Sequence, residues 1–600
     1  MKLTVSTTEQ LVNAIKDTNV TEICMTDGVY RLSQPVVIER SNVRVYAESE
    51  NVVICGLKSI PVEKSRVTAI DLKSYGIAVP SFEGGPYIDF WEDNDIPKPH
   101  LEKSGKGIEV FCGNKAMELS RYPEQGYIRI SKVYGDDSKK FLNEPNGCSE
   151  GVIETDDEKF YDILDDDTLL VGYWSRDWAL QRHKVEKREG KKLYLDTPYH
   201  FMGYRYGLDY MDETPGGRFY AFNSVKCVDK PGKWAIDHKN QILYVYPYEN
   251  QSEIEVSVCK NLFVIKNCNN VSVENIEFYG ASETAIVATD ITNLKISACN
   301  IHNVGAWAVD AKNCIQSVVC DCTVTATGGG GISLHGGERA TLKSSDNLVC
   351  RNTLYEIAEW HRVYMAAIEI NGVGITVSEN KVYNVPHFAI LHQGNNNIIE
   401  RNNIENACYE SNDAGAIYGG RDYTCRGLIV RYNYIHNMAG CLNMGCVGIY
   451  FDDAFSGADV YGNIIAHLPN GIGIELGGGR DFKIHNNYFV DCTYAMLSDN
   501  RVKTWGDWLY NKLVKHLGEI DYKCQLWKDS YPDLYDITEN DIRQPLNNKI
   551  YDNTVCGGCG YLISSKEVAD MTTFTGNNYI PDIIPEQIDK WHLTWYNTKK

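Results

Sequence analysis

Val349-Cys-Arg-Asn352-Thr-Leu and Val377-Ser-Glu-Asn380-Lys-Val are two copies of a pattern that recurs from about residue 271 onward. Eleven copies can be aligned, and their fourth position reads, in chain order, Ile276, Cys299, Cys322, Asn352, Asn380, Asn402, Asn433, Asn463, Asn487, Asn553 and Asn577. Successive copies are 22 to 31 residues apart, except for one step of 66 residues. A self-similar period of this length is typical of a solenoid.

The residues around each asparagine indicate which solenoid is formed. Each copy is a short alternation of Val, Ile and Tyr that ends at Gly, Asn or Pro, which is a strand signal rather than a helix signal. We therefore predict an all-β fold, a right-handed parallel β-helix. Neighbouring coils then lie about 4.7 to 4.9 Å apart, so an asparagine repeated at one turn can hydrogen-bond to its own copies. The alternative, asparagines that serve only as turn residues, would remove the ladder but not the solenoid.

Composition limits the partners of the chain. Its 600 residues include 80 acidic and 59 basic side chains, a net charge of −21, and no run of Lys or Arg stands out. Nucleic acid and anionic membranes are poor partners for such a surface. The first residues lack the apolar segment of a secretion signal, and no stretch approaches the 18 apolar residues of a membrane helix. We expect a cytoplasmic protein, or a secreted one if a signal has been removed, and its oligomeric state stays open.

The 20 cysteines are read as reduced thiols, because several sit in strand copies where Cys acts as a small apolar residue. Cys556-Gly-Gly-Cys559 is a lone C-x-x-C without a second pair at zinc spacing. Calcium is an alternative at exposed aspartates, but no loop has the spacing of an EF-hand. We predict no metal ion and no cofactor.

The places where the repeat is absent divide the chain into five parts. Between the first coils and the main repeat, the sequence has strand signals but no repeat period. Farther along the chain, a segment rich in Trp and Tyr accounts for the step of 66 residues. The predicted parts are 1–84, an N-terminal cap with the first coils; 85–255, an inserted β-sandwich-like domain; 256–502, the main β-helix with a functional groove; 503–545, a Trp/Tyr-rich insertion beside that groove; and 546–600, the last coils and a C-terminal cap.

A second strand of each coil presents polar side chains on its outer face. Side chains alternate along a strand, so the second and fourth members of each aligned set share that face. One predicted row contains Ser333, Glu369, Tyr418, Tyr450 and Glu475, and the next contains His335, Asn371, His392 and Asp452. A merely solvated surface would instead be rich in Lys, Glu, Thr and Ser. The rows therefore favour a functional groove.

Two acidic segments stand out along these rows. Asp413 precedes the Gly-rich strand that contains Tyr418, and Asp452 and Asp453 end the corresponding strand of the next coil. Glycosidic bond cleavage needs one carboxylic acid to protonate the leaving oxygen and one carboxylate to act as nucleophile or base. Acids crowded on adjoining coils also push their pKa values apart, which separates these roles. Alternatively, any one of them only caps a turn; strand parity favours Asp452 over Asp453 as the outward residue.

A set of motifs resembles the β-helix glycoside hydrolases of family 141. They are Pro386-His387, Cys408-Tyr-Glu410, Asp413-Ala-Gly-Ala-Ile-Tyr418, Gly420-Arg421-Asp422, Arg431-Tyr-Asn433, Asp452-Asp453 and Gly478-Gly-Arg480-Asp481, with Arg121-Tyr-Pro123, Arg218-Phe-Tyr220 and Pro231-Gly-Lys-Trp234 in the inserted domain. The family includes α-L-fucosidases and xylanases, and the resemblance implies a catalytic pair of Asp413 with Asp452 or Asp453. This chain has Gly419-Gly420 where the family pattern leads us to expect Thr-Gly.

The first hypothesis is therefore a glycoside hydrolase acting on an oligosaccharide or polysaccharide. The side chains expected to bind substrate or tune the acids are Glu369, His335, Asn371, His392, Tyr418, Arg421, Tyr450 and Glu475. Arg421 is either a substrate clamp or an ion-pair partner of a nearby aspartate. Retention or inversion depends on whether the carboxyl groups lie about 5 to 5.5 Å or about 6.5 to 9.5 Å apart. The alternatives are a polysaccharide lyase on the same fold and a non-catalytic carbohydrate-binding solenoid.

Overall fold

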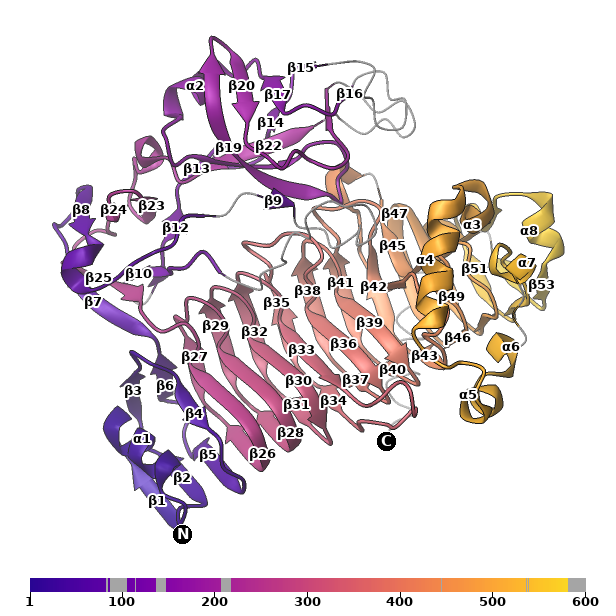
Figure 1. The fold of residues 1–600 in the computed structure, drawn as a ribbon, viewed down its shortest axis with the longest axis horizontal. Helices are drawn as coiled ribbons and strands as arrows, with labels where there is room; N and C mark the ends of the chain where they lie inside the picture. Colours follow the sequence, from indigo (N-terminus) through magenta and orange to yellow (C-terminus); the bar gives the residue numbers. More distant parts are fainter. Residues whose placement is uncertain are drawn as a thin grey trace.

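The computed structural model describes residues 1–82, 85–86, 105–113, 115–135, 147–206, 217–443, 445–535, 537 and 539–580. Strands stacked in parallel form one long coil, with a second body of strands above it and a group of helices at one end (Figure 1). The coil is a right-handed parallel β-helix, as predicted. Each coil contributes one strand to each of three parallel sheets, here called the ladder sheet, the middle sheet and the third sheet.

The ladder sheet ends, in each repeat, just before the ladder position. Its strands are β1 (Lys2–Val5), β2 (Glu22–Met25), β5 (Val43–Ala47), the second halves of β26 (Phe263–Glu274) and β28 (Ile286–Ser297), β31 (Val318–Cys320), β34 (Leu348–Cys350), β37 (Thr376–Ser378), β40 (Ile398–Glu400), β43 (Leu428–Arg431), β46 (Ala458–Tyr461), β48 (Lys483–His485), β50 (Asn548–Tyr551) and β53 (Thr572–Thr575).

The middle sheet begins directly after the ladder position. Its strands are β3 (Gly28–Arg31), β6 (Val52–Cys55), β27 (Glu277–Tyr279), β29 (Asn300–Val304), β32 (Thr323–Thr327), β35 (Thr353–Tyr355), β38 (Lys381–Val385), β41 (Asn403–Ala407), β44 (Tyr434–His436), the first parts of β47 (Ile464–Leu476) and β49 (Tyr488–Ser498), β51 (Thr554–Cys556) and β54 (Asn578–Ile580).

The third sheet carries the predicted outer rows. Its strands are β4 (Val36–Ile38), the first halves of β26 and β28, β30 (Val309–Ile315), β33 (Ile332–Gly336), β36 (Ile368–Val373), β39 (Ile390–Asn395), β42 (Gly415–Gly420), β45 (Val447–Asp452), the second parts of β47 and β49, and β52 (Tyr561–Ile563).

The asparagine ladder is present. From Asn352 to Asn577, each Asn Nδ2 donates to the Oδ1 of the next Asn in the row, at 2.9 to 3.0 Å. The residue before each ladder position has a positive φ, for example 56° at Arg401 and 57° at Tyr432. The asparagines therefore both satisfy one another in the interior and hold a left-handed turn that most side chains disfavour.

The inserted body begins earlier in the chain than the predicted boundary at residue 85. Strand β7 (Leu57–Pro61) pairs with β25 (Glu253–Ser257), and β8 (Thr68–Asp71) pairs with β24 (Ile242–Val245), so the coil is left at about residue 56. The remaining strands of this body are β9 (Gly85–Pro86), β10 (Val110–Cys112), β11 (Lys115–Ala116), β12 (Glu118–Leu119), β13 (Arg121–Tyr122), β14 (Ile128–Arg129), β15 (Lys132–Tyr134), β16 (Gly147–Cys148), β17 (Val152–Glu154), β18 (Leu169–Tyr173), β19 (Leu180–Glu189), β20 (Lys192–Leu195), β21 (Tyr204–Arg205), β22 (Arg218–Phe222) and β23 (Lys233–Asp237), with helix α2 (Glu158–Ile163).

This body is also more layered than a sandwich of two facing sheets. All five residues of β18 are buried, and its alternate side chains enter two different cores. Leu169 and Val171 pack among residues of β23 and β25, whereas Leu170 packs on the other side with Phe160 of α2 and Phe219. A strand buried on both faces reads as a continuous apolar run, so strand alternation does not reveal its second layer.

The second insertion is helical and packs against the coils. It contains α3 (Arg501–Thr504), α4 (Asp507–Gly518), α5 (Gln525–Ser530), α6 (Pro532–Tyr535) and α7 (Glu539–Ile542). Leu509, Leu513 and Leu517 of α4 are buried at four-residue spacing, against Tyr423 and Ala454 of the coils. The ends of the chain contribute α1 (Thr8–Lys16), capped by Thr7, and α8 (Lys566–Asp570); the last part of the predicted C-terminal cap, residues 581–600, lies outside the described residues.

Among the described residues, no helix is both long and apolar enough to cross a membrane. All 20 cysteines are free thiols, and most of them are buried.

Candidate functional site

The first predicted outer row of the third sheet exists in the predicted register. Ser333 pairs with Glu369, Tyr418 with Tyr450, and Tyr450 with Glu475 on successive coils. Leu391 stands between Glu369 and Tyr418. Because the parity along the strands is the same in each coil, these side chains share the outer face of the third sheet.

The second predicted row contains one error, at His392. His392 pairs with Ile370, whereas Asn371 pairs with Gln393, so β39 is shifted by one residue from the predicted alignment. The ring of His392 is therefore buried inside the coil, where it contacts Phe451 and Phe455, and burial lowers its pKa to about 3. A one-residue slip moves a side chain to the opposite face, which removes His392 from the expected substrate-binding set.

His392 also accounts for the unexpected Gly419. A Cβ at Gly419 would lie 2.4 Å from Cε1 of the His392 ring, much closer than van der Waals contact. The interior of the coil therefore accommodates either the imidazole or a side chain at position 419. The glycine at position 419 is thus explained by packing.

Ser333, His335 and Glu369 form a separate hydrogen-bonded group on β33 and β36. His335 Nε2 lies 2.9 Å from Glu369 Oε1 and 3.2 Å from Ser333 Oγ. Asn371, next in the second row, is exposed. These residues lie on the predicted face, on strands upstream of the acidic segments.

The acidic residues of the next coils converge on two arginines. We call Asp413, Asp452, Asp453, Glu475 and Asp499, together with Arg421 and Arg501, the carboxylate cluster. The guanidinium of Arg501 donates to Asp452 Oδ1 at 2.7 Å, to Glu475 Oε1 at 2.6 Å and to Asp499 Oδ2 at 2.7 Å. Arg421 contacts Asp452 Oδ2 at 3.2 Å and, through Nε, Asp453 Oδ2 at 2.7 Å. Arg421 is thus an ion-pair partner of both aspartates.

Arg501 and Asp499 were not identified from the sequence. They lie at the end of β49 and the start of α3, where the repeat stops and the helical insertion begins. Arg501 is 51 residues from Tyr450 and 49 from Asp452 in the chain, yet it hydrogen-bonds both. No periodic signal marks such a residue, because the insertion does not follow the period of the coils.

Two tyrosines of the outer row connect the acids. Tyr418 Oη donates to Asp452 Oδ2 at 2.7 Å, and Tyr450 Oη donates to Asp413 Oδ1 at 2.9 Å. Tyr450 Oη also accepts from Arg501 at 3.1 Å. The ring of Tyr418 stacks on Phe388, with ring centroids 4.2 Å apart. The sequence prediction thus placed both tyrosines correctly on the acidic face.

Charge imbalance sets the protonation of the cluster. Five carboxyl groups face two guanidinium groups, so the cluster has more acids than cations to pair with them. The protein atoms packed around its carboxyl group, together with the charge of Asp452, raise the pKa of Asp413, although part of the residue reaches solvent. Burial also acts to raise the pKa of Asp452, but Arg421 and Arg501 outweigh it and hold that pKa below its ordinary value. The two aspartates are therefore pushed in opposite directions.

Two other acids of the cluster also retain protons more readily. Burial and the neighbouring Asp452 raise the pKa of Asp453 to about 6. Burial is the main cause that raises the pKa of Glu475 to about 8, against the opposing charge of Arg501. Asp452 is thus the member of this group whose ionised form is most strongly favoured.

Asp413 is the solvent-exposed acid of the candidate pair. Its Oδ1 lies 2.9 Å from Tyr450 Oη, which lies 3.1 Å from Arg501 Nη1. That nitrogen in turn lies 2.7 Å from Asp452 Oδ1. These two oxygens are therefore no more than about 9 Å apart, within the range over which two carboxyl groups can act on one glycosidic bond. Asp453 is less accessible, with a side chain 3% exposed against 10% for Asp452.

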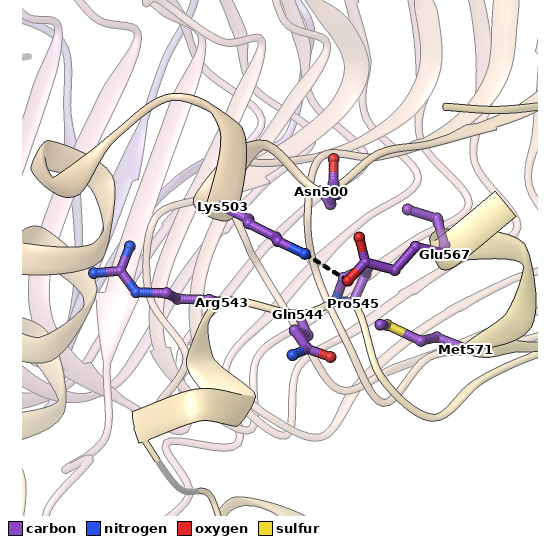
Figure 2. Close-up of a pocket in the computed structure, with 8 residues that line it drawn as sticks. Asn500, Lys503, Arg543, Gln544, Pro545, Glu567 and Met571 are labelled. Carbon is purple, nitrogen blue, oxygen red and sulfur yellow. Dashed lines mark hydrogen bonds and ion pairs between the residues drawn. The ribbon is translucent and has the colours of Figure 1, made fainter. Parts of the chain in front are cut away.

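A separate hollow lies outside the carboxylate cluster, between the second insertion and α8 (Figure 2). It is lined by Asn500, Lys503, Arg543, Gln544, Pro545, Glu567, Val568 and Met571. Lys503 forms an ion pair with Glu567 across it, at 2.5 Å. No acid of the cluster lines this hollow. Within the described residues, no group of three or more His, Cys, Asp or Glu side chains is arranged to hold a metal ion.

Comparisons with known proteins agree with the fold. A family model described as a right-handed β-helix region matches residues 239–363 and 366–505. A solved structure titled "Glycoside hydrolase" is 12% identical, with 97% of this chain and 94% of that chain covered and a TM-score of 0.54. Another, titled "The complex structure of XylC with xylose", is 12% identical over 98% of this chain and 87% of that one, with a TM-score of 0.47. No curated protein matches by sequence. At 12% identity the likeness to the first of these structures concerns the fold alone, and together with the family model it agrees that the chain is a right-handed parallel β-helix.

Proposed function

We propose that this protein is a glycoside hydrolase in which Asp413 and Asp452 are the catalytic pair. The observation that carries the proposal is that one connected cluster shifts the pKa values of these two carboxyl groups in opposite directions. Asp413 keeps its proton more readily and is the general acid, whereas Asp452 is ionised between two arginines and is the nucleophile or the base for water. Environments that divide two carboxyl groups in this way are typical of acid and base pairs.

Asp453 has a supporting role in this proposal. Its backbone N–H donates to Asp452 Oδ1 at 2.8 Å, and its carboxylate pairs with Arg421. It therefore orients Asp452 and Arg421, and its side chain is less accessible than that of Asp452. Between the two aspartates that the sequence left open, accessibility and ionisation favour Asp452.

Trp505 is a platform for a sugar ring in this proposal. It ends α3, its side chain is 49% exposed, and its ring lies 4.7 Å from the guanidinium carbon of Arg501. An exposed indole of this kind can bury the apolar face of a sugar, while the acids act on the neighbouring linkage. The resemblance to glycoside hydrolase family 141 favours an α-L-fucoside or a xylan-type substrate.

The polysaccharide lyase alternative is less favoured. A lyase acting on a uronate needs a cation to neutralise the substrate carboxylate, and both arginines of the cluster are already engaged by aspartates and glutamate. A third anion would add to an excess of negative charge. A non-catalytic binding solenoid would not require two acids of opposite tuning.

The test is product formation on a panel of α-fucosides, α- and β-xylosides, galactosides, arabinosides and uronate polymers. Asp413→Asn and Asp452→Asn should each reduce release of reducing sugar by about 100-fold or more. Asp310→Asn is the control, because Asp310 is an acid on the same outer face, in the first row next to Ser333, and pairs with Lys312. It should retain activity. An unsaturated, ultraviolet-absorbing product would favour the lyase. No product from any substrate of the panel would favour the non-catalytic binding solenoid.

A further inference from the structure

The inserted body meets the β-helix at the segment that leads into Asp413. This segment, residues 408–413, joins β41 of the middle sheet to β42 of the third sheet. Asp413 itself has a φ of 47°, a left-handed conformation that must be held by its surroundings. Contacts from both the β-helix and the inserted body hold this segment.

Arg218 of β22 is the central contact. Its side chain is 1% exposed and lies between the rings of Tyr127 and Tyr173, at 4.1 and 4.0 Å. Its Nε donates to Asp177 Oδ1 at 2.9 Å, and its Nη2 donates to the backbone oxygen of Glu410 at 3.0 Å. A buried, oriented guanidinium thus reaches from the inserted body to the main chain three residues before Asp413.

The side chain of Glu410 ties the same segment to both bodies. Tyr127 Oη donates to Glu410 Oε1 at 2.7 Å, and Arg362, from a loop of the β-helix, donates to Oε2 at 2.7 Å. Burial would raise the pKa of Glu410, but Arg362 outweighs it and keeps that pKa below its ordinary value. An ionised, charge-assisted network is stronger and more directional than neutral hydrogen bonds.

The two residues that precede Asp413 are anchored as well. Asn412 Nδ2 donates to Asp177 Oδ2 at 3.3 Å, so the carboxylate of Asp177 binds both Arg218 and the segment. Ser411 Oγ lies 2.8 Å from Nδ1 of the buried His387. Each of the residues 410, 411 and 412 is therefore bound, and two of them are bound by the inserted body.

We propose that the Asp177–Arg218 pair of the inserted body is a positioning device for Asp413. The inference rests on the proposed function: by fixing residues 410 and 412, the pair sets where the acid stands relative to Asp452. The inserted body is then part of the catalytic apparatus, and its docking controls the rate. Displacements of about 1 Å at a reacting group can cost about 100-fold in rate.

The test compares Arg218→Gln with Arg182→Gln in the full chain. Arg182 of β19 is also buried in the inserted body, and its Nη2 donates to the backbone oxygen of Trp360, in the β35–β36 loop that also carries Arg362. Both changes remove a buried guanidinium from the same domain contact, but only Arg218 donates directly to the segment of Asp413. Should Arg218→Gln fail to fold, Asp177→Asn is the second variant, since it breaks the same pair with a nearly isosteric side chain.

We expect Arg218→Gln to lower kcat by about 10- to 100-fold with little change in KM, and to move the alkaline limb of the pH profile that reports Asp413. Hydrogen exchange of amides 408–414 should rise in this variant. Arg182→Gln should keep kcat within about threefold and leave that exchange unchanged, although its melting temperature falls too. Equal losses of kcat in the two variants, or unchanged exchange in Arg218→Gln, would overturn the inference.

The two proposals can fail separately. An active wild type with unchanged kcat in Arg218→Gln contradicts only the positioning of Asp413. Activity that survives Asp413→Asn contradicts the catalytic assignment, while raised exchange at residues 408–414 in Arg218→Gln would still support the anchoring of the segment.

Discussion

Replacing one interior asparagine tests whether the ladder stabilises the coil. Asn402 lies in the middle of the row, fully buried. Its Nδ2 donates to Asn433 Oδ1 at 2.9 Å and to Val377 O at 3.0 Å, and its Oδ1 accepts from both the backbone N–H and Nδ2 of Asn380. Asn402→Ala therefore removes the acceptor of a buried backbone donor and interrupts the row.

The expected cost follows from these contacts. Leaving the backbone N–H of Asn380 without its acceptor costs about 1 to 3 kcal/mol. Each of the two hydrogen bonds donated by Asn402 Nδ2 contributes about 1 kcal/mol more. We therefore expect Asn402→Ala to lower the free energy of unfolding by about 3 to 5 kcal/mol. The matched control is Asn293→Gly, because Asn293 has a φ of 61°, which Gly adopts without the strain that Ala would add. Asn293 donates to Asn270 Oδ1 at 2.8 Å in a second row on the outside of the coil, where water can replace the contact. It should cost about 1 kcal/mol or less.

The assay is urea unfolding followed by far-ultraviolet circular dichroism, with the midpoint and slope compared for each variant. A large fall in the midpoint for Asn402→Ala and a small one for Asn293→Gly would support the ladder as a main source of stability. Equal midpoints for the two variants would refute the reasoning, since burial of the hydrogen bonds would then contribute nothing.

Three further predictions concern the carboxylate cluster. Activity should follow a bell-shaped pH profile. It should rise with pH as Asp452 ionises, at a pKa below the usual value for Asp, and fall as Asp413 loses its proton, at a pKa above that value. In Asp413→Asn the alkaline limb should disappear from any residual activity. Arg501→Gln should raise the pKa of Asp452, move the acid limb to higher pH and lower kcat by at least about 100-fold. The pH dependence of kcat measures both effects, and an unmoved acid limb would contradict the role of Arg501. Trp505→Ala should raise KM about 10-fold for oligosaccharides and leave kcat on a small aryl glycoside unchanged, with the less exposed neighbour Trp508→Ala as control; an unchanged KM would remove the platform.

Several features of the molecule could be predicted because they repeat. The asparagine at the fourth position of each copy predicted the ladder, and strand parity predicted that Tyr418, Tyr450 and Glu475 share one face. A period of two along a strand and a fixed step between coils are local rules, so a single sequence carries them. His392 was misplaced because one residue of slip, invisible in the apolar pattern of β39, reverses its direction.

The sequence by itself therefore determined the solenoid, its ladder, the outer row and the acidic segments that end its strands. Only the tertiary structure decided the charge state of those acids and their support. Arg501 comes from the insertion that follows the coils, and Arg218 comes from a body 192 residues before Glu410 in the chain. Neither follows the repeat, because these contacts depend on how separate parts of the chain dock. The ionisation of Asp413 and Asp452 depends on burial and on charges brought together over such distances, which no local pattern encodes.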